Sequence, residues 1–171
     1  VKNVAGILEF QSEAKNSGDA EAKDLTLIGP LALDLSVKPE DVQVHYVSRG
    51  AYRKAQFAGC GEVCGGGWNA PQSAGWIAIE NTKAKEILFL GVEWESYWKV
   101  ELKPCECGVR LLCSLETGGQ TLARRARLKS PRVFMGVSHG DVDDSLRVFH
   151  DHLRRIMPAP PKNFPWVSYD L

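Results

Sequence analysis

The chain has 171 residues, the size of about one domain. It carries 21 basic and 21 acidic residues, so its formal net charge is zero and no overall field attracts nucleic acid or an anionic membrane. Hydrophobic residues make up 44% and charged residues 25%, which excludes disordered and collagen-like classes. The longest apolar runs, such as Ile87–Leu90, are far shorter than the ~20 residues of a transmembrane helix. We therefore expect a globular domain with neither a nucleic-acid nor a membrane partner.

Short apolar or alternating segments, separated by turn-forming residues, predict β-strands. Gly29-Pro30 separates the first two segments, and Pro39-Glu40-Asp41 precedes the third. The predicted strands cover residues 25–28, 31–37, 42–47, 76–80, 87–90, 93–102, 109–115 and 133–137. Short strands at such regular spacing predict a mainly β fold, an antiparallel β-sandwich or barrel.

One segment near the C-terminal end has helical periodicity instead. Its apolar residues recur at steps of three or four, at Val142, Leu146, Phe149, Leu153 and Ile156. Acidic residues in its first turn and arginines in its last turn complement the helix dipole, and Pro158 ends it. This pattern predicts a helix near 142–156.

The residues after the helix predict a domain boundary. The Pro-rich stretch from Pro158 to Asn163 is typical of a stiff connector. Phe164 to Leu171 then alternates between apolar and polar residues up to the last position, which predicts an interrupted strand and hence a fragment of a longer protein. We expect a β-sandwich domain over residues 1–158, helix included, and a linker with the start of a truncated strand over 159–171.

The five cysteines fit a metal site poorly. Cys60 and Cys64 form one pair and Cys105 and Cys107 another, and Cys113 stands apart. Two pairs in proximity would make a four-thiolate zinc site, but structural zinc sites space their thiolates about two to four residues apart. Free buried thiols or one disulfide are the favoured interpretation, and no histidine adjoins them to activate a nucleophile. We predict neither a metal nor a cofactor.

The acidic clusters have ordinary explanations. Asp141, Asp143 and Asp144 lie where the predicted helix begins, and capping and the helix dipole account for them. Glu93 and Glu95 flank Trp94 and share one face of a predicted strand, which is more typical of a solvated face than of an acid/base pair.

The tryptophans provide the most informative functional signal. Flat aromatic rings stack on the C–H faces of sugars, while Asn and Arg side chains bind hydroxyls. Trp94 and Trp98 share strand parity and are expected in the core. Trp68 follows a run of glycines and is expected to be exposed, so we predict a saccharide site in which Trp68 stacks on the ring and Asn69 and Arg53 bind hydroxyls.

Two runs of sequence, Gly75 to Asn81 and Ile87 to Leu102, carry a family resemblance. They resemble the N-terminal β-supersandwich domain of family 36 glycoside hydrolases, the α-galactosidase group, in which an apolar strand ends in Gly and leads into a Trp-Ser-x-x-Trp-like stretch. Three further stretches agree in order: Val44–Lys54, Leu128–Phe134 and Phe164–Asp170, of which the last resembles the first strand of the catalytic barrel.

The resemblance implies a domain without catalytic machinery, because the two catalytic aspartates of that family lie on later barrel strands and no position here matches them. The leading hypothesis is a carbohydrate-associated domain that binds a saccharide, such as a galactoside or a plant polysaccharide oligomer, or packs on the catalytic barrel of the same parent chain. A first alternative is a small stand-alone glycoside hydrolase that uses Glu93 or Glu95 with an Asp of 141–144. A second is a structural module that self-associates into a homo-oligomer through an exposed apolar patch including Trp166.

Overall fold

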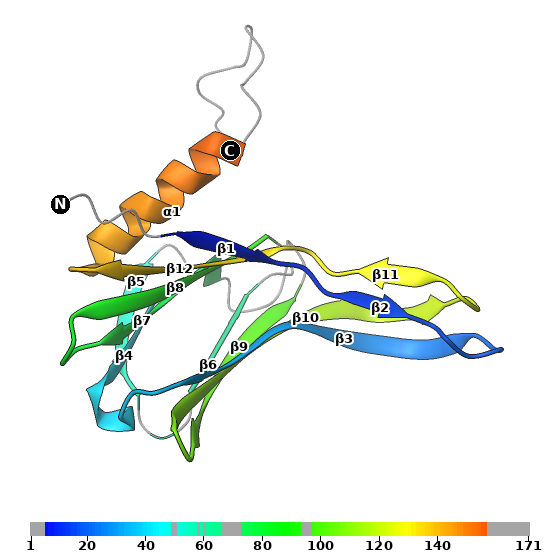
Figure 1. Ribbon diagram of the computed structural model, residues 1–171, viewed down its shortest axis with the longest axis horizontal. Coiled ribbons are helices and arrows are strands. Elements are labelled where there is room, and N and C mark those ends of the chain that lie inside the picture. The colour runs from blue at the N-terminus through cyan, green and yellow to red at the C-terminus, as the bar shows by residue number, and fades with distance from the viewer. Residues whose placement is uncertain are drawn as a thin grey trace, which may run out of the picture.

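The computed structural model describes residues 6–48, 51–57, 59, 61–65, 73–93 and 97–156. Its strands form two antiparallel sheets and a short ribbon (Figure 1). The larger sheet has six strands in the order β1 (Ile7–Phe10), β12 (Val133–His139), β8 (Glu86–Val92), β7 (Ser73–Asn81), β4 (Val42–Ser48) and β5 (Ala51–Gln56). The smaller sheet has four, in the order β3 (Ala22–Leu35), β10 (Gly108–Leu122), β9 (Trp98–Cys105) and β6 (Gly61–Gly65). The ribbon pairs β11 (Arg127–Lys129) with β2 (Glu13–Lys15), and a short 3-10 turn, η1 (Pro39–Asp41), precedes β4.

The main core lies between the two sheets. Ile77 of β7 and Leu90 of β8 meet Val100 of β9 and Leu111 of β10, and all four are fully buried. Burying one such side chain contributes about 1.5–3 kcal/mol to stability. Trp98, at the start of β9, is 3% exposed in the same core, which confirms the prediction for this indole; Trp94 lies outside the described residues. The predicted mainly β sandwich is thereby confirmed.

The long strand β3 differs from the prediction of two strands separated by a turn at Gly29-Pro30. It runs through this pair, and β10 follows it along most of its length. Leu31 pairs with Cys113 and Ile28 with Leu115, so two residues of β3 stand opposite one residue of β10. This β-bulge accommodates the proline, which has no N–H to donate to the sheet.

The other differences concern edges and strand ends. The alternation did not predict β5, whose residues are mostly exposed at the edge of the larger sheet, nor the short strands β1, β2, β6 and β11. The strand predicted from Glu93 begins at Trp98, and β10 continues seven residues beyond its predicted end at Leu115 to Leu122. Edge strands with two solvated faces lack the apolar alternation on which the predictions depend.

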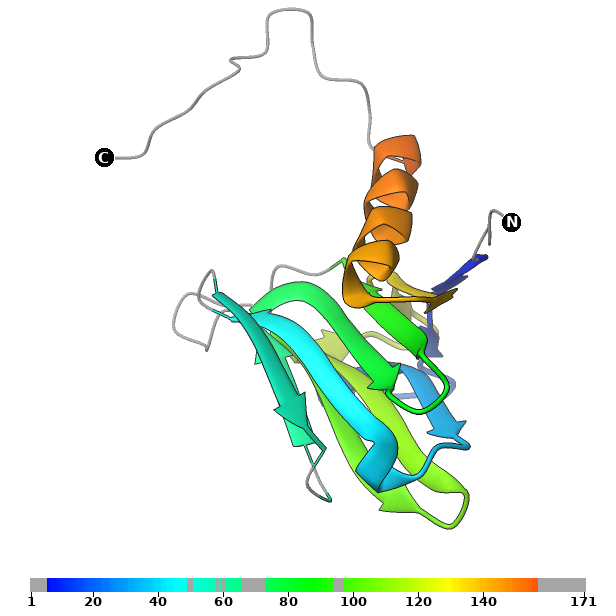
Figure 2. The same ribbon diagram turned by 90° about the vertical axis from the view of Figure 1, so that its left-hand side faces the viewer.

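The helix α1 spans Val142–Ile156, as its periodicity predicts. Asp141 caps it, because its Oδ1 accepts a hydrogen bond from the backbone N–H of Asp144 at 3.0 Å. This confirms the capping interpretation of the acidic cluster. Figure 2 shows α1 leaning on one face of the larger sheet, where it contacts β7, β8 and β12. Within the described residues, no helix combines the length and the apolar character needed to cross a bilayer.

A second, smaller core lies between α1 and the outer face of the larger sheet. It consists of Trp76, Ala78, Ile87, Phe89, Phe134 and Phe149. The sheet therefore buries both of its faces where α1 covers it, which explains the uninterrupted apolar runs Trp76–Ile79 in β7 and Ile87–Leu90 in β8. The predicted linker and truncated strand over 159–171 lie outside the described residues.

Candidate functional site

Several strands of the larger sheet begin or end at the same end of the sheet, which we call the loop end (residues 47–48, 51–52, 73–76 and 91–93). Ser48, the last residue of β4, pairs with Ser73, the first residue of β7, and with Ala51, the first of β5. Trp76 pairs with Gly91, one residue before the end of β8. β4 ends and β5 begins at this end, and here too β7 begins and β8 ends. Residues far apart in the sequence are therefore brought together here.

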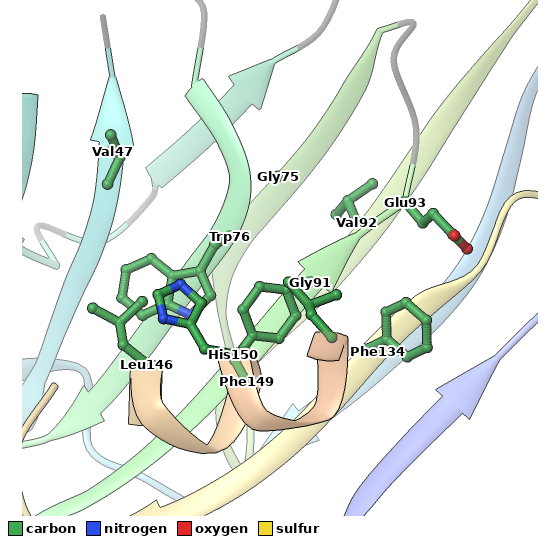
Figure 3. A pocket seen from close by; sticks show the side chains of 11 residues that line it. Val47, Gly75, Trp76, Gly91, Val92, Glu93, Phe134, Leu146, Phe149 and His150 are labelled. Carbon is green, nitrogen blue, oxygen red and sulfur yellow. The ribbon is translucent and has the colours of Figure 1, made fainter. Parts of the chain in front are cut away.

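A pocket of about 420 Å³ opens at the loop end, between α1 and strands β7 and β8 (Figure 3). Its walls are mainly apolar and aromatic, with Trp76, Val92, Phe134, Leu146 and Phe149 among the lining residues. His150 of α1 and Glu93 add polar groups. A volume of this size, with few polar groups, is typical of sites that bind a small molecule or a partner side chain.

Gly91 determines the shape of the pocket floor. A Cβ at this position would lie 2.3 Å from Cε2 and 2.6 Å from Cζ of Phe149, so only glycine lets that ring rest on β8. Phe149 also makes an edge contact with Phe89, the ring centroids being 6.2 Å apart. The close approach of α1 to the sheet therefore depends on a missing side chain.

Trp76 presents an unusual polar group in this pocket. The residue is 4% exposed, and its Nε1–H has no hydrogen-bond partner among the described residues. Leaving such a buried donor unpaired costs about 1–3 kcal/mol. The atom itself is closed to solvent, so an acceptor outside the chain reaches it only if the side chains around it move. The mainly apolar lining of the pocket is suited to an apolar group.

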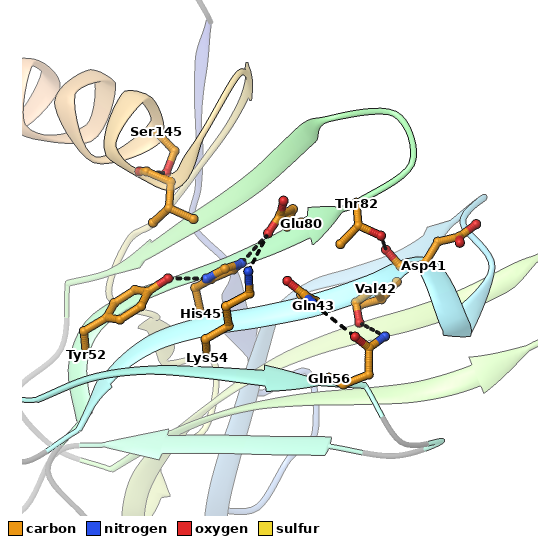
Figure 4. A network of polar contacts seen from close by, with 11 residues as sticks. Asp41, Val42, Gln43, His45, Tyr52, Lys54, Gln56, Glu80, Thr82 and Ser145 are labelled. Carbon is orange, nitrogen blue, oxygen red and sulfur yellow. Dashed lines mark hydrogen bonds and ion pairs between the residues drawn. The ribbon is translucent and has the colours of Figure 1, made fainter.

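A chain of polar contacts follows β4, β5 and β7 beside the pocket (Figure 4). His45 is buried between Tyr52, whose Oη lies 2.5 Å from its Nδ1, and Glu80, whose Oε2 lies 2.7 Å from its Nε2. Lys54 approaches the same Glu80 oxygen at 3.9 Å. Burial is the largest influence on the pKa of His45 and lowers it, against the opposing effect of the Glu80 carboxylate. The neutral ring then donates from Nε2–H to Glu80 and accepts from Tyr52.

This series of polar contacts resembles a proton relay, but Tyr52 at its end is a poor nucleophile. Burial, reinforced by Glu80 and Asp143, raises the pKa of Tyr52, so the phenol keeps its proton. The contacts satisfy every ring nitrogen of a buried histidine, which is a structural role.

Of the three predicted saccharide residues, the structure describes only Arg53. Arg53 lies on β5 directly opposite Tyr46, whose side chain packs against the inter-sheet core. Opposite residues of a pair share a face, so the exposed Arg53 side chain leaves the sheet on the face away from the pocket. Trp68 and Asn69 lie outside the described residues.

The carboxylate pair of a stand-alone glycosidase is contradicted for Glu93. Both of its carboxylate oxygens accept hydrogen bonds from Arg132, at 2.6 and 2.9 Å. Asp141 follows the opposite end of β12, whose seven residues span roughly 20 Å at about 3.3 Å each. Catalytic carboxyl pairs lie about 5 to 9.5 Å apart. Glu93 therefore does not act with an Asp of 141–144, and Glu95 lies outside the described residues.

A four-thiolate zinc site is excluded by strand register. Cys64 pairs in the β6–β9 ladder with Lys99, six residues before Cys105, which is roughly 20 Å along the strand. Cys113 is buried in the core. Cys105 and Cys107 are close to each other, with their sulfur atoms 3.2 Å apart.

Sequence reasoning did not single out the pocket residues Trp76, Gly91 and Phe149. The available signal was Gly91, an isolated glycine within an apolar strand, which indicates a close approach of another element. The identity of that element depends on where α1 packs, and periodicity alone does not specify it.

No protein-family model and no curated protein matches the sequence. Solved structures match the fold. An α-galactosidase from Lactobacillus brevis superposes with a TM-score of 0.71 at 7% identity, over 87% of this chain and 22% of its own. The galactosidase domain of AgaSK, an α-galactosidase-sucrose kinase, superposes with a TM-score of 0.73 at 13% identity. The GH36 α-galactosidase AgaA from Geobacillus stearothermophilus superposes with a TM-score of 0.68 at 11% identity. Each match covers 86% of this chain and 22% of the neighbour.

The chain thus spans about a fifth of the length of the enzymes that it matches. At these identities the likeness concerns the fold. The resemblance to the β-supersandwich domain of family 36 glycoside hydrolases, inferred from the Trp-rich strands, is confirmed at that level.

Proposed function

We propose that this chain is a non-catalytic β-sandwich domain of an α-galactosidase-like glycoside hydrolase. The observation that carries the proposal is the coverage: nearly the whole chain matches, over 86 to 87% of its length, while 22% of each neighbour is matched. Activity in such an enzyme would then reside in the remainder, the catalytic barrel. In this assignment residues 1–158 form the domain and residues 159–171 the linker and the start of the barrel.

The principal role in this proposal is packing on the catalytic barrel of the same parent chain. The pocket between α1 and β7 supports it, because its mainly apolar wall suits an apolar side chain of a partner. The helix that walls the pocket also leads directly into the proposed linker. A barrel that follows the linker would be near this face.

Saccharide binding is a second role, supported by the register at the loop end. The segment that contains Trp68 and Asn69 joins β7 at Ser73, which pairs with Ser48 next to the start of β5. Arg53 is the third residue of β5. AgaA, one of the structural neighbours, has been solved with stachyose and with raffinose. We propose an oligosaccharide of this class as the ligand.

The first experiment titrates the purified chain with galactose, raffinose, and xylan and β-glucan oligosaccharides, followed by tryptophan fluorescence and calorimetry. A chromogenic α-galactoside is the control for turnover. We expect no turnover. Saturable raffinose binding with a Kd near or below ~1 mM, lost in a Trp68→Ala/Asn69→Ala variant and weakened by Arg53→Ala, would support the saccharide role. Binding unaffected by these substitutions would reject the site, and turnover by the chain alone would reject the non-catalytic assignment.

The packing role is tested with Trp76→Phe, which removes the N–H and keeps an aromatic ring. Because the donor is unpaired in the described structure, we expect the free energy of unfolding of the isolated chain to fall by no more than the cavity left by the smaller ring accounts for. A larger loss would show that the N–H is already satisfied within this chain. The coding sequence around this chain provides an independent test: a barrel-encoding segment after Leu171 supports the assignment, and a stop codon there rejects it.

A further inference from the structure

Two thiols face each other at the tip of the β9–β10 hairpin. Cys105 is the last residue of β9, and Cys107 lies in the two-residue turn before Gly108, which pairs with Cys105. The sulfur atoms are 3.2 Å apart. Gly108 has a φ of 141°, and a Cβ there would lie 2.4 Å from the carbonyl oxygen of Leu35 on β3. The hairpin tip is therefore packed tightly on the neighbouring strand, which holds the two thiols in this arrangement.

Asp34 and Arg110 complete the cluster. One side-chain oxygen of Asp34 and both sulfur atoms lie within 4.8 Å of one another, a set of donors that a metal ion could use. Both carboxylate oxygens, however, accept hydrogen bonds from Arg110, at 2.6 and 2.7 Å. A metal ion would have to compete with this bidentate pair, and the guanidinium charge repels it. Because Arg110 already occupies both carboxylate oxygens, the cluster is better suited to chemistry between the two thiols than to metal binding.

We propose that Cys105 and Cys107 form a reversible dithiol–disulfide pair that reacts with small disulfides such as oxidised glutathione. Cys107 is exposed and Cys105 is half-buried, so the first attack falls to Cys107. Its thiolate attacks one sulfur of the small disulfide, the S–S bond breaks, and one thiolate leaves and takes up a proton. The Cys105 thiolate then attacks Sγ of Cys107 and releases the second thiol. Two protein thiols are oxidised by two electrons, and the small disulfide is reduced to two thiols.

Cys113 provides a matched control. Cys113 is 1% exposed, and burial raises the pKa of its thiol to about 12, so it is unreactive at neutral pH. The hydrogen bond with Cys105, more than burial, raises the pKa of the Cys107 thiol, and Asp34 adds to the effect. The reaction is therefore best followed near pH 8.5, about the pKa of an ordinary thiol.

The experiment uses the full chain with Cys60 and Cys64 replaced by serine, so that only the described thiols are counted. The reduced protein is incubated with oxidised glutathione, its free thiols are alkylated, and its intact mass is measured. We expect a product that has lost two hydrogen atoms and two alkylation sites and carries no glutathione. Adding Cys105→Ser should stop the reaction at a glutathione adduct on Cys107, whereas Cys113→Ser should leave it unchanged.

Two results would overturn the proposal. One is a stable glutathione adduct, or no reaction, in the protein that retains both Cys105 and Cys107. The other is stoichiometric Zn²⁺ binding to the reduced protein that blocks oxidation and is abolished by Asp34→Asn, which would assign a metal site instead. Circular dichroism of each variant establishes that the fold is retained.

Discussion

The contact between Gly91 and Phe149 predicts a specific energetic coupling between strand β8 and helix α1. Replacing Gly91 with alanine adds one methyl group, whose carbon would overlap the Phe149 ring at 2.3 and 2.6 Å. The ring also makes an edge contact with Phe89 on the same face of β8, so it must either shift toward the pocket or lift the helix. Either response perturbs the smaller core and no other described part of the fold.

The expected cost can be worked from this geometry. Overpacking of a core lowers the free energy of unfolding by about 1–3 kcal/mol. Replacing glycine by alanine within a strand raises it by about 0.5–1 kcal/mol. The net loss of unfolding free energy for Gly91→Ala is then about 1.5 kcal/mol, which for a chain of this size lowers Tm by roughly 3–6 °C. In a Phe149→Ala background the overlap is gone, so the same substitution should stabilise by about 0.5 kcal/mol. The coupling energy of the double-mutant cycle is about 2 kcal/mol.

Urea denaturation followed by circular dichroism measures the four variants of the cycle. Gly29→Ala is the matched control, because its Cβ would lie 3.7 Å from the nearest atom, the carbonyl oxygen of Cys113. Since Gly29 also lies within a strand, we expect this control to stabilise the chain by about 0.5–1 kcal/mol. A Gly91→Ala variant as stable as the control, with effects that add to those of Phe149→Ala, would refute the role assigned to the glycine.

Three further predictions concern local polar groups. Because the pKa of His45 is lowered in the folded state, its contribution to the free energy of unfolding should be fully present above pH 6.5 and should decrease as the pH falls below 6.5. His45→Gln should reduce this dependence on pH, which denaturation at a series of pH values measures. Asp141→Ala should lose about 1 kcal/mol through the missing cap, whereas the equally acidic Asp143→Ala should lose less in the same thermal melts. Asn16 is 8% exposed and donates to three backbone carbonyls, so Asn16→Ala should cost about 2–4 kcal/mol in urea denaturation.

The parts of the fold that the sequence predicted correctly are those with a local physical cause. The helix at 142–156 follows from a period that its own residues define, and the buried strands β7 and β8 follow from uninterrupted apolar runs. β5 was not predicted, because an exposed edge strand has no apolar alternation. Gly29-Pro30 predicted a turn because a bulge and a turn use the same residue types, and only the pairing with β10 distinguishes them.

The candidate sites depend on register, which no local pattern specifies. Glu93 and Asp141 looked compatible as a pair, but β12 holds them at opposite ends. Cys64 is separated from Cys105 by most of β9, whereas Cys105 and Cys107, whose short spacing argued against zinc, come within 3.2 Å across one turn. The spacing that disfavours a structural metal site is the spacing that brings two thiols into reach of each other.

The outer face of the larger sheet has an apolar half, covered by α1, and a half that contains buried polar groups. Beneath α1, glycine and aromatic side chains make a tightly packed contact, while on β4 and β5 the buried His45 has both ring nitrogens paired. Between them, the N–H of Trp76 has no partner among the described residues, although the fold satisfies the neighbouring histidine completely. Since an unpaired buried donor costs about 1–3 kcal/mol, a partner that supplies an acceptor would gain that free energy on binding. Because that N–H is closed to solvent, a bound partner would have to displace the side chains around it before its acceptor could reach Trp76.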